Sequence, residues 1–230
     1  MPKPGDVLGF QEMCATEGKM LQQGMHFRRG TGHSILLMSR RRDAPYPDRM
    51  SADGKRLYYV GHDAYGEKRK SEIDQPLVGA KNTLTANGKF FYAAQEAKMS
   101  GELELVRVYE KIASGIWVFN GLFRLTDSRF EHDGRRNVCI FELELIESEY
   151  EVGDIQEKTD ISLGRLIPTE VKLAVWKRDK GRCQFEGCGA TTDLHFDHII
   201  PYSLGGSSTD ANNIQLLCGR HNVSKGARII

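Results

Sequence analysis

Residues 183–226 read CQFEGCGATTDLHFDHIIPYSLGGSSTDANNIQLLCGRHNVSKG. Two pairs of soft metal-binding residues frame this stretch, Cys183 with Cys188 at one end and Cys218 with His221 at the other. Each pair encloses a short knuckle, and two such pairs separated by an intervening segment are typical of tetrahedral zinc sites. We therefore predict that these four residues bind a structural zinc ion.

A second motif lies largely between the two pairs. It resembles the HNH (ββα-metal) nuclease family over about residues 175–228, and the matching residues are Asp197-His198, Pro201, Gly205-Gly206, Asn213 and Asn222. The resemblance implies a hairpin with Asp197 and His198 on its first strand and residues 213–217 on its second. A helix bearing Asn222 and Lys225 is expected to follow. The final His of the family pattern is Asn222 here, so we expect weaker metal binding with activity retained.

These residue types suit phosphodiester hydrolysis. Imidazole titrates near neutral pH, so His198 can take a proton from an attacking water. Asp197 and Asn222 offer hard oxygen ligands for a catalytic Mg²⁺ or Mn²⁺ ion. By the resemblance, Asn213 ties the loop and orients His198. Lys225, one turn beyond Asn222, is expected to touch the phosphate.

Three further residues receive no catalytic role. His195 precedes His198 by three positions on the same predicted strand, so its side chain belongs to the opposite face. We expect it to be a packed histidine or one that forms a hydrogen bond to a metal-binding residue without binding the metal itself. Cys14 and Cys139 are expected to be buried free thiols.

The first part of the chain has the pattern of strands. Apolar and polar residues alternate with period two in several segments, and the predicted strands are residues 34–38, 56–60, 103–109, 115–125 and 138–145. Residues 90–99 are rich in helix formers and predict a helix against the sheet. The fold class expected is α+β, with a β-rich domain over residues 1–150, a linker over 151–168 and a zinc-stabilised nuclease domain over 169–230. A unit of that size has a small core, so the metal is expected to supply much of its folding free energy.

The first 150 residues resemble the SRA (SET and RING associated) domain, which flips a modified cytosine out of duplex DNA. The matching stretches, in family order, are residues 24–26, 34–37, 46–48, 59–61, 74–75, 84–87, 106–109 and 117–123.

The resemblance implies a pocket for the flipped base. Tyr46 and Tyr59 would stack on the base and Asp48 would accept a hydrogen bond from its exocyclic amine. Asp43 and Asp63 are the alternatives for the acid. The loop 62–71, with Lys68 and Arg69, occupies the place where the family contacts the duplex, although a solvated loop is an open alternative.

The composition is compatible with a DNA-binding protein but does not require one. The net charge is +1, but Lys and Arg come in clusters that either face DNA or are ordinary solvated charges. The five cysteines are an odd number and three lie near the end of the chain, which favours metal binding over disulfides. No stretch has the length of a membrane helix and no signal peptide is apparent, so we expect a protein of the prokaryotic cytoplasm without a membrane partner.

Together the two resemblances predict a type IV, modification-dependent restriction endonuclease. Its partner would be double-stranded DNA carrying 5-methylcytosine or 5-hydroxymethylcytosine. We expect a homodimer, because one HNH site hydrolyses one strand and a double-strand break needs two. Two alternatives stay open at this point: a DNA-binding protein that does not cleave, and an HNH nuclease with no preference for modified cytosine.

Overall fold

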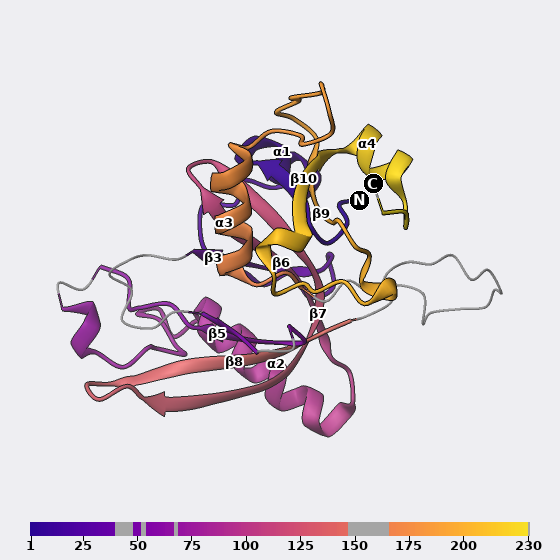
Figure 1. The fold of residues 1–230 in the computed structure, drawn as a ribbon. Coiled ribbons are helices and arrows are strands. Elements are labelled where there is room, and N and C mark those ends of the chain that lie inside the picture. The colour runs from indigo at the N-terminus through magenta and orange to yellow at the C-terminus, as the bar shows by residue number, and fades with distance from the viewer. Residues whose placement is uncertain (40–47, 52–53, 67–68, 147–165, 230) are drawn as a thin grey trace. The chain divides into compact units, whose positions relative to one another are not determined.

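The computed structural model describes residues 1–39, 48–51, 54–66, 69–146 and 166–229 (Figure 1). The helices are α1 (Phe10–Thr16), α2 (Ala86–Ser100), α3 (Thr169–Asp179) and α4 (Gly219–Lys225). The strands are β1 (Asp6–Gly9), β2 (Met25–His26), β3 (Ser34–Ser39), β4 (Arg49–Met50), β5 (Arg56–Val60), β6 (Glu104–Ala113), β7 (Ile116–His132), β8 (Asn137–Leu145), β9 (Leu194–His198) and β10 (Ile214–Cys218). The predicted α+β class is confirmed, as are all five long strands and the helix.

The described residues form two compact units that interleave along the chain. Unit 1 comprises Met1–Met20, Glu110–Gly121 and Ile146–Ile230, and unit 2 comprises Leu21–Tyr109 and Leu122–Leu145. Strands β6 and β7 contribute residues to both units. The boundaries expected at residues 150 and 169 stay predictions, and most of the expected linker lies outside the described residues.

The sheet of unit 1 is built around β1. Val7 of this strand pairs with Leu194 of β9 on one side and with Val118 of β7 on the other. The neighbouring backbone continues both pairings, because Gly5 N donates to Phe119 O at 2.9 Å and Phe196 N donates to Gly5 O at 3.0 Å. The predicted hairpin β9–β10 is present, with Gln215 opposite Asp197, and β1 joins it to β7.

The core of unit 1 draws on distant parts of the sequence. Val175 of α3 and the β10 residues Ile214 and Leu216 are fully buried, and they share one cluster with Ile112 and Val118. Residues of β6 and β7 therefore add apolar surface to the core of the expected C-terminal unit. That the metal supplies much of the folding free energy stays a prediction.

A buried ion pair joins α3 to β6 and β7 within unit 1. Lys172 Nζ donates to Glu110 Oε2 at 2.7 Å and to Asn120 Oδ1 at 2.6 Å. The Lys172 and Glu110 side chains are 3% and 5% exposed. Burial by itself would raise the pKa of Glu110, but the charge and hydrogen bond of Lys172 outweigh burial and hold this pKa below its usual range.

Unit 2 consists of the strand runs β7–β6–β3–β2 and β4–β5–β8–β7 with the helix α2. Helix α2 begins where Thr85 Oγ1 accepts a hydrogen bond from Gly88 N at 3.0 Å, and it ends at Gly101, whose φ of 78° only glycine adopts easily. Phe90 of α2 is fully buried and its ring lies 5.9 Å from that of Phe141 of β8. The helix thus leans on the sheet, as its composition predicts.

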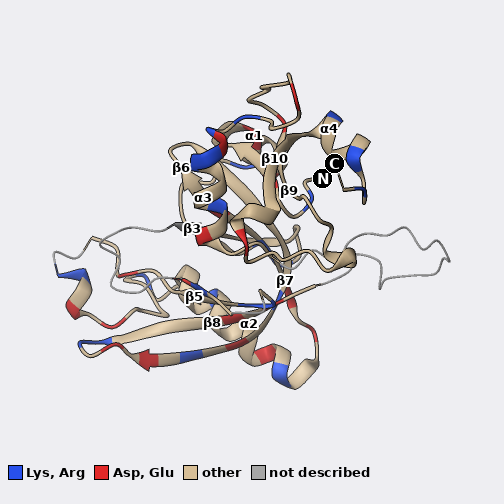
Figure 2. Ribbon diagram, in the orientation of Figure 1, with Lys and Arg blue, Asp and Glu red and all other residues tan. Residues whose placement is uncertain are grey.

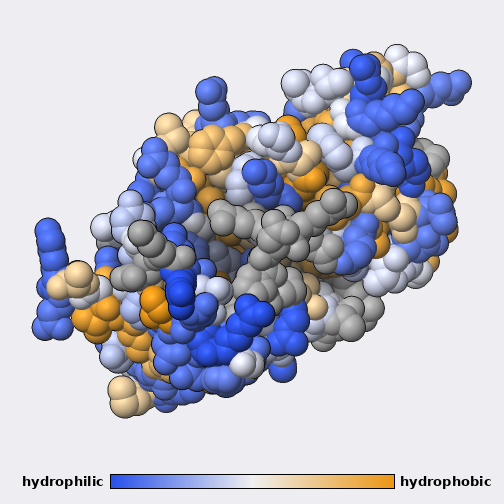
Figure 3. Space-filling view, turned by 90° about the vertical axis from the view of Figure 1, so that its left-hand side faces the viewer, coloured by the Kyte–Doolittle hydropathy of each residue, from blue (hydrophilic) through white to orange (hydrophobic). Residues whose placement is uncertain are grey.

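Charges of both signs are mixed along the elements of the structure. In Figure 2, the β7–β8 ribbon carries acidic and basic bands, and Arg129 pairs there with Glu131 and Glu142. On the face that Figure 3 shows, hydrophobic residues form separate areas among hydrophilic ones. Within the part of the chain that the structure describes, no helix combines the length and the apolar character needed to cross a membrane.

Replacing Lys172 by methionine tests the buried ion pair. We expect Lys172→Met to lower the free energy of unfolding by about 3–5 kcal/mol, because Glu110 would stay buried without its counter-charge. The measurement is denaturant unfolding. Lys177→Met on the exposed side of α3 is the matched control and should be close to neutral; equal stability of the two variants would contradict this assignment.

Candidate functional site

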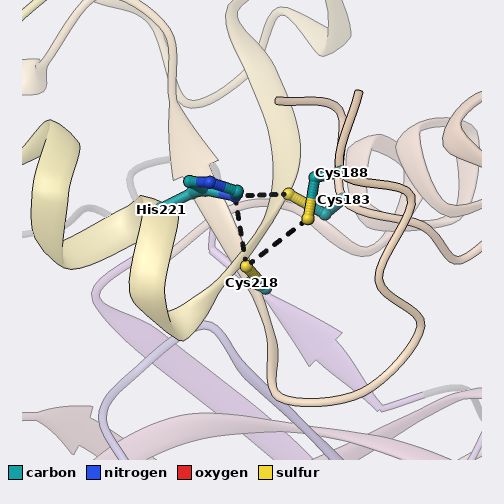
Figure 4. A group of neighbouring side chains, drawn as sticks. All are labelled: Cys183, Cys188, Cys218 and His221. Carbon is teal, nitrogen blue, oxygen red and sulfur yellow. Dashed lines mark hydrogen bonds between the residues drawn. The ribbon is translucent and has the colours of Figure 1, made fainter. Parts of the chain in front are cut away.

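Three cysteines and one histidine converge in unit 1. Cys183, Cys188, Cys218 and His221 place one ligand atom each within 4.8 Å of one another. Figure 4 shows these four side chains turned toward a common centre, with Cys218 at the end of β10 and His221 on α4. The His221 ring presents Nδ1, which lies 3.3 Å from Cys218 Sγ and 3.5 Å from Cys183 Sγ. The predicted set is thereby brought together, and its donors fit a tetrahedral zinc ion.

Two neighbours fix the His221 ring. The ring of Phe185, from the first knuckle, stacks on it with centroids 4.0 Å apart and an interplanar angle of 13°. Arg220 Nη2 lies 3.2 Å from His221 Nε2 on the side away from the cysteines. The stacking fixes the plane of the ring, and Nδ1 faces the sulfur atoms.

His198 lies at the last residue of β9, beside Asp197. Its Nε2 is 2.8 Å from Ser208 Oγ. Burial lowers the pKa of His198, Asp197 acts to raise it, and Lys225 acts to lower it; the net pKa lies below the usual value. A half-buried imidazole that is neutral near pH 7 can accept a proton.

Asp197 is held by two partners. Lys225 Nζ lies 3.1 Å from Asp197 Oδ2, and Gln215 Nε2 donates to the same oxygen at 3.2 Å. Lys225 Nζ also donates to His198 O at 2.7 Å, and its side chain is 1% exposed. Lys225 therefore anchors the end of β9 from α4. The contact with phosphate expected for it stays a prediction, and this burial does not favour it.

Asn213 clamps the loop after β9. Its Oδ1 accepts from Ile200 N at 2.8 Å, while its Nδ2 donates to Ile200 O at 3.1 Å and to Ser207 O at 3.0 Å. A Cβ at Gly206 would lie 1.7 Å from Ile200 O, so only glycine fits there. The amide thus ties both sides of the loop together, which accounts physically for the Gly-Gly and Asn elements of the motif.

Asn222 and His195 have different surroundings. Asn222 lies on α4 with a half-buried side chain that has no hydrogen-bond partner among the described residues, and its role as a metal ligand stays a prediction. His195 Nδ1 lies 2.6 Å from Asp6 Oδ1 of β1, and its Nε2 lies 3.3 Å from Asp193 Oδ1. Burial lowers the pKa of His195, but Asp6 and Asp193 outweigh it and raise the pKa overall. His195 thus couples β9 to β1 and lies outside the cysteine cluster.

In unit 2, Tyr59 and Asp48 come together. Asp48 Oδ1 accepts from Val60 N at 3.0 Å, and burial together with the charge of Asp48 raises the pKa of Tyr59 well above its usual value. The Tyr59 hydroxyl donates toward Gly24 O at 3.2 Å and Leu37 O at 3.3 Å, and the residue is 3% exposed. Its role as a stacking face stays a prediction; in this structure its ring is buried.

The motif residues of unit 2 brace the segment that follows β5. Asn87 exchanges two hydrogen bonds of 2.8 Å with the backbone of His62, and Gln75 Nε2 donates to Gly61 O at 2.6 Å. A Cβ at Gly61 would lie 2.7 Å from Gln75 Oε1 and 2.8 Å from Asn87 Oδ1. The stretches 59–61, 74–75 and 84–87, which are far apart in the sequence, therefore hold one backbone turn.

The remaining residues predicted for the base pocket and the DNA-contacting loop differ in their placement. Asp63 is an ion-pair partner of the buried Arg136 and also receives Gln75 Nε2 at 3.3 Å, so it has a structural task. Arg69 is 79% exposed and pairs with Glu72 at 3.4 Å. Tyr46, Asp43 and Lys68 lie outside the described residues, and their roles stay predictions.

The comparisons with known proteins agree with this geometry in the C-terminal part of the chain. Residues 182–228 match the family model described as HNH endonuclease. No curated protein has a significant match to the sequence. The chain therefore carries an HNH endonuclease domain, and the expected resemblance is confirmed there.

Similar solved structures include SRA domains. The SUVH5 SRA domain in complex with fully methylated CG DNA is 19% identical, with a TM-score of 0.47 over 66% of this chain and 94% of that chain. The SUVH5 SRA domain with hemi-methylated CG DNA is also 19% identical, with a TM-score of 0.45 over 66% of this chain and 94% of that chain. KRYPTONITE in complex with mCHH DNA is 16% identical, with a TM-score of 0.45 over 67% of this chain and 34% of that chain.

Several residues of the site were missed by sequence reasoning. Ser208 contacts His198, Gln215 contacts Asp197, and Phe185 stacks on His221. The only sequence signal for Ser208 was its position just after the Gly-Gly turn. Gln215 was detectable in principle, because it lies opposite Asp197 in the expected hairpin.

Loss of one metal ligand tests the cluster. We expect Cys183→Ser to abolish stoichiometric zinc binding, measured by elemental analysis, and to lower the melting temperature, because zinc binding contributes to folding. Cys14→Ala, a change at a buried cysteine of unit 1 outside the cluster, should retain zinc. Full zinc content in Cys183→Ser would exclude this ligand.

Proposed function

We propose that this protein is a modification-dependent DNA endonuclease. Unit 2 recognises a flipped 5-methylcytosine or 5-hydroxymethylcytosine, and the HNH domain hydrolyses phosphodiester bonds nearby. The observation that carries the proposal is the arrangement around His198, in which one clamped loop and one buried lysine hold a neutral imidazole beside a carboxylate.

The residues of the HNH domain divide the work of hydrolysis. His198 accepts the proton of the attacking water, and Asn213 fixes the loop on which its position depends. Lys225 and Gln215 orient the Asp197 carboxylate. A Mg²⁺ or Mn²⁺ ion held by Asp197 and Asn222 would neutralise charge on the phosphate and the leaving oxygen. The cysteine cluster with its zinc has a structural task, because all four of its protein ligands are supplied by the chain.

The proposal that unit 2 recognises modified cytosine, and so acts as the reader of the DNA, rests on the contacts of Asp48. The pairing of Asp48 with the backbone of Val60 places a carboxylate beside the start of the braced turn at Gly61 and His62. A carboxylate accepts hydrogen bonds from an exocyclic amine, which is what recognition of cytosine requires. Tyr46 and Tyr59 would supply the aromatic surfaces.

We further propose a homodimer, because one HNH site cuts one strand and a double-strand break needs two sites. Light scattering at the working concentration measures this. A monomeric mass together with full double-strand cleavage would refute the dimer.

Cleavage of matched plasmids tests the function. One plasmid prepared unmodified, 5-methylated and 5-hydroxymethylated is incubated with Mg²⁺ or Mn²⁺. We expect cutting of the modified forms alone, and we expect His198→Ala to reduce the rate by about 10²–10⁴-fold because the general base is lost.

The other outcomes separate the alternatives. Equal cutting of all three plasmids would retain the nuclease and discard the reader. DNA binding without cutting by the unaltered protein would identify a non-cleaving DNA-binding protein.

Substitution of Asp48 tests the reader. Asp48→Asn keeps an oxygen for Val60 N but removes the charge, so we expect the preference for modified over unmodified DNA to fall by about tenfold while the fold is retained. The measurement is competition binding with the two DNAs. Glu72→Ala, at an exposed carboxylate of the same unit, is the control; an unchanged preference in Asp48→Asn would remove Asp48 from the pocket.

A further inference from the structure

Ser208 is the neighbour of the His198 imidazole. Ser208 Oγ lies 2.8 Å from Nε2, and Ser208 is 4% exposed. Among the described residues, no other group forms a hydrogen bond with the imidazole, so Nδ1 has no protein partner there. One ring nitrogen is thus held by a buried hydroxyl, while the other has no hydrogen-bond partner among the described residues.

The position of Ser208 is itself fixed. Its neighbour Ser207 accepts Asn213 Nδ2 at 3.0 Å, and the same amide group holds Ile200, two residues after His198. Gly206 packs against both Ile200 O and Asn213 Nδ2 with no room for a side chain. The loop therefore presents the Ser208 hydroxyl to β9 in a defined place.

The adjacent carboxylate is not the partner of His198. Asp197 Oδ2 is engaged by Lys225 at 3.1 Å and by Gln215 at 3.2 Å. Among the described residues, the hydrogen-bond partner of Nε2 is the serine hydroxyl, so Ser208 is the protein group that can influence which ring nitrogen carries the proton.

We propose that Ser208 is a positioning residue whose hydroxyl oxygen accepts a hydrogen bond from Nε2–H of His198, which leaves Nδ1 as the nitrogen that takes a proton from the attacking water. This inference rests on the proposed nuclease function. The opposite arrangement, in which the serine donates to Nε2, would put the ring proton on Nδ1 and leave no basic nitrogen facing the water. Asn213 then acts on His198 through the loop and Ser208, with no direct contact needed.

Cleavage kinetics of three variants test the proposal. We expect Ser208→Ala to lower kcat by about 10- to 100-fold with KM for modified DNA unchanged, as for other residues that orient a catalytic histidine. Ser208→Thr keeps the hydroxyl and should restore most of the rate. Ser207→Ala is the matched control, because the Ser207 hydroxyl bonds to Thr209 Oγ1 at 2.9 Å and not to the imidazole. Zinc content and melting temperature verify that each variant is folded.

The ring tautomer gives a second readout that a general loss of structure would not mimic. In ¹⁵N-histidine NMR spectra at a pH where His198 is neutral, we expect the Nε2–H form in the unaltered protein and a mixture of tautomers in Ser208→Ala. Unaltered kcat in Ser208→Ala, or the same tautomer with and without the serine, would overturn the proposal. If the unaltered protein cuts no DNA, the proposed function fails, while the NMR comparison still decides whether Ser208 sets the tautomer.

Discussion

The pairing of β1 with two partners is the constraint on which unit 1 depends. A ββα hairpin has two edges, and in isolation β9 would expose its backbone groups on the side away from β10. Val7 pairs with Leu194 and with Val118, so β1 fills that edge and extends the sheet into β7. The salt bridge between Asp6 and His195, with 2.6 Å between its atoms, reinforces the same junction. The nuclease domain is therefore completed by residues from the beginning of the chain.

The other edge of the hairpin is closed by two side chains and one backbone amide. Leu216 N of β10 donates to Asp179 Oδ2 at 2.9 Å, and Gln184 N donates to Leu216 O at 2.8 Å. Arg178 Nη2 donates to Ile214 O at 2.6 Å. The end of α3 and the first knuckle thus satisfy the backbone that a free edge strand would offer to another chain. Because both edges of the hairpin are occupied, the strand that carries Asp197 and His198 has little freedom to slip in register.

Sequence reasoning succeeded where the information is local. The four metal ligands follow from the spacing of two short pairs, whereas the hairpin β9–β10 and the helix α4 follow from the resemblance of this stretch to the HNH family. The structure contains all of them. Sequence reasoning failed where partners are remote. A four-residue strand such as β1 has too little pattern to be recognised, and its partners β7 and β9 lie more than 100 residues away in the sequence. The partner of Lys172 could not be predicted either, since nothing near it in the sequence reveals Glu110.

Partners that are remote in the sequence also change how the basic residues are interpreted. The sequence contains many lysine and arginine residues that could contact DNA. In the structure, however, Lys172 and Lys225 are buried and pair with carboxylates. Arg178 forms an ion pair with Asp179.

Within unit 1, Lys177, Lys180 and Arg182 are exposed and have no side-chain partner among the described residues. These three cations follow one another along the end of α3 and the turn after it. Because phosphate attraction needs cations that are not already neutralised, this segment is better suited to a phosphate contact than the buried Lys225 is.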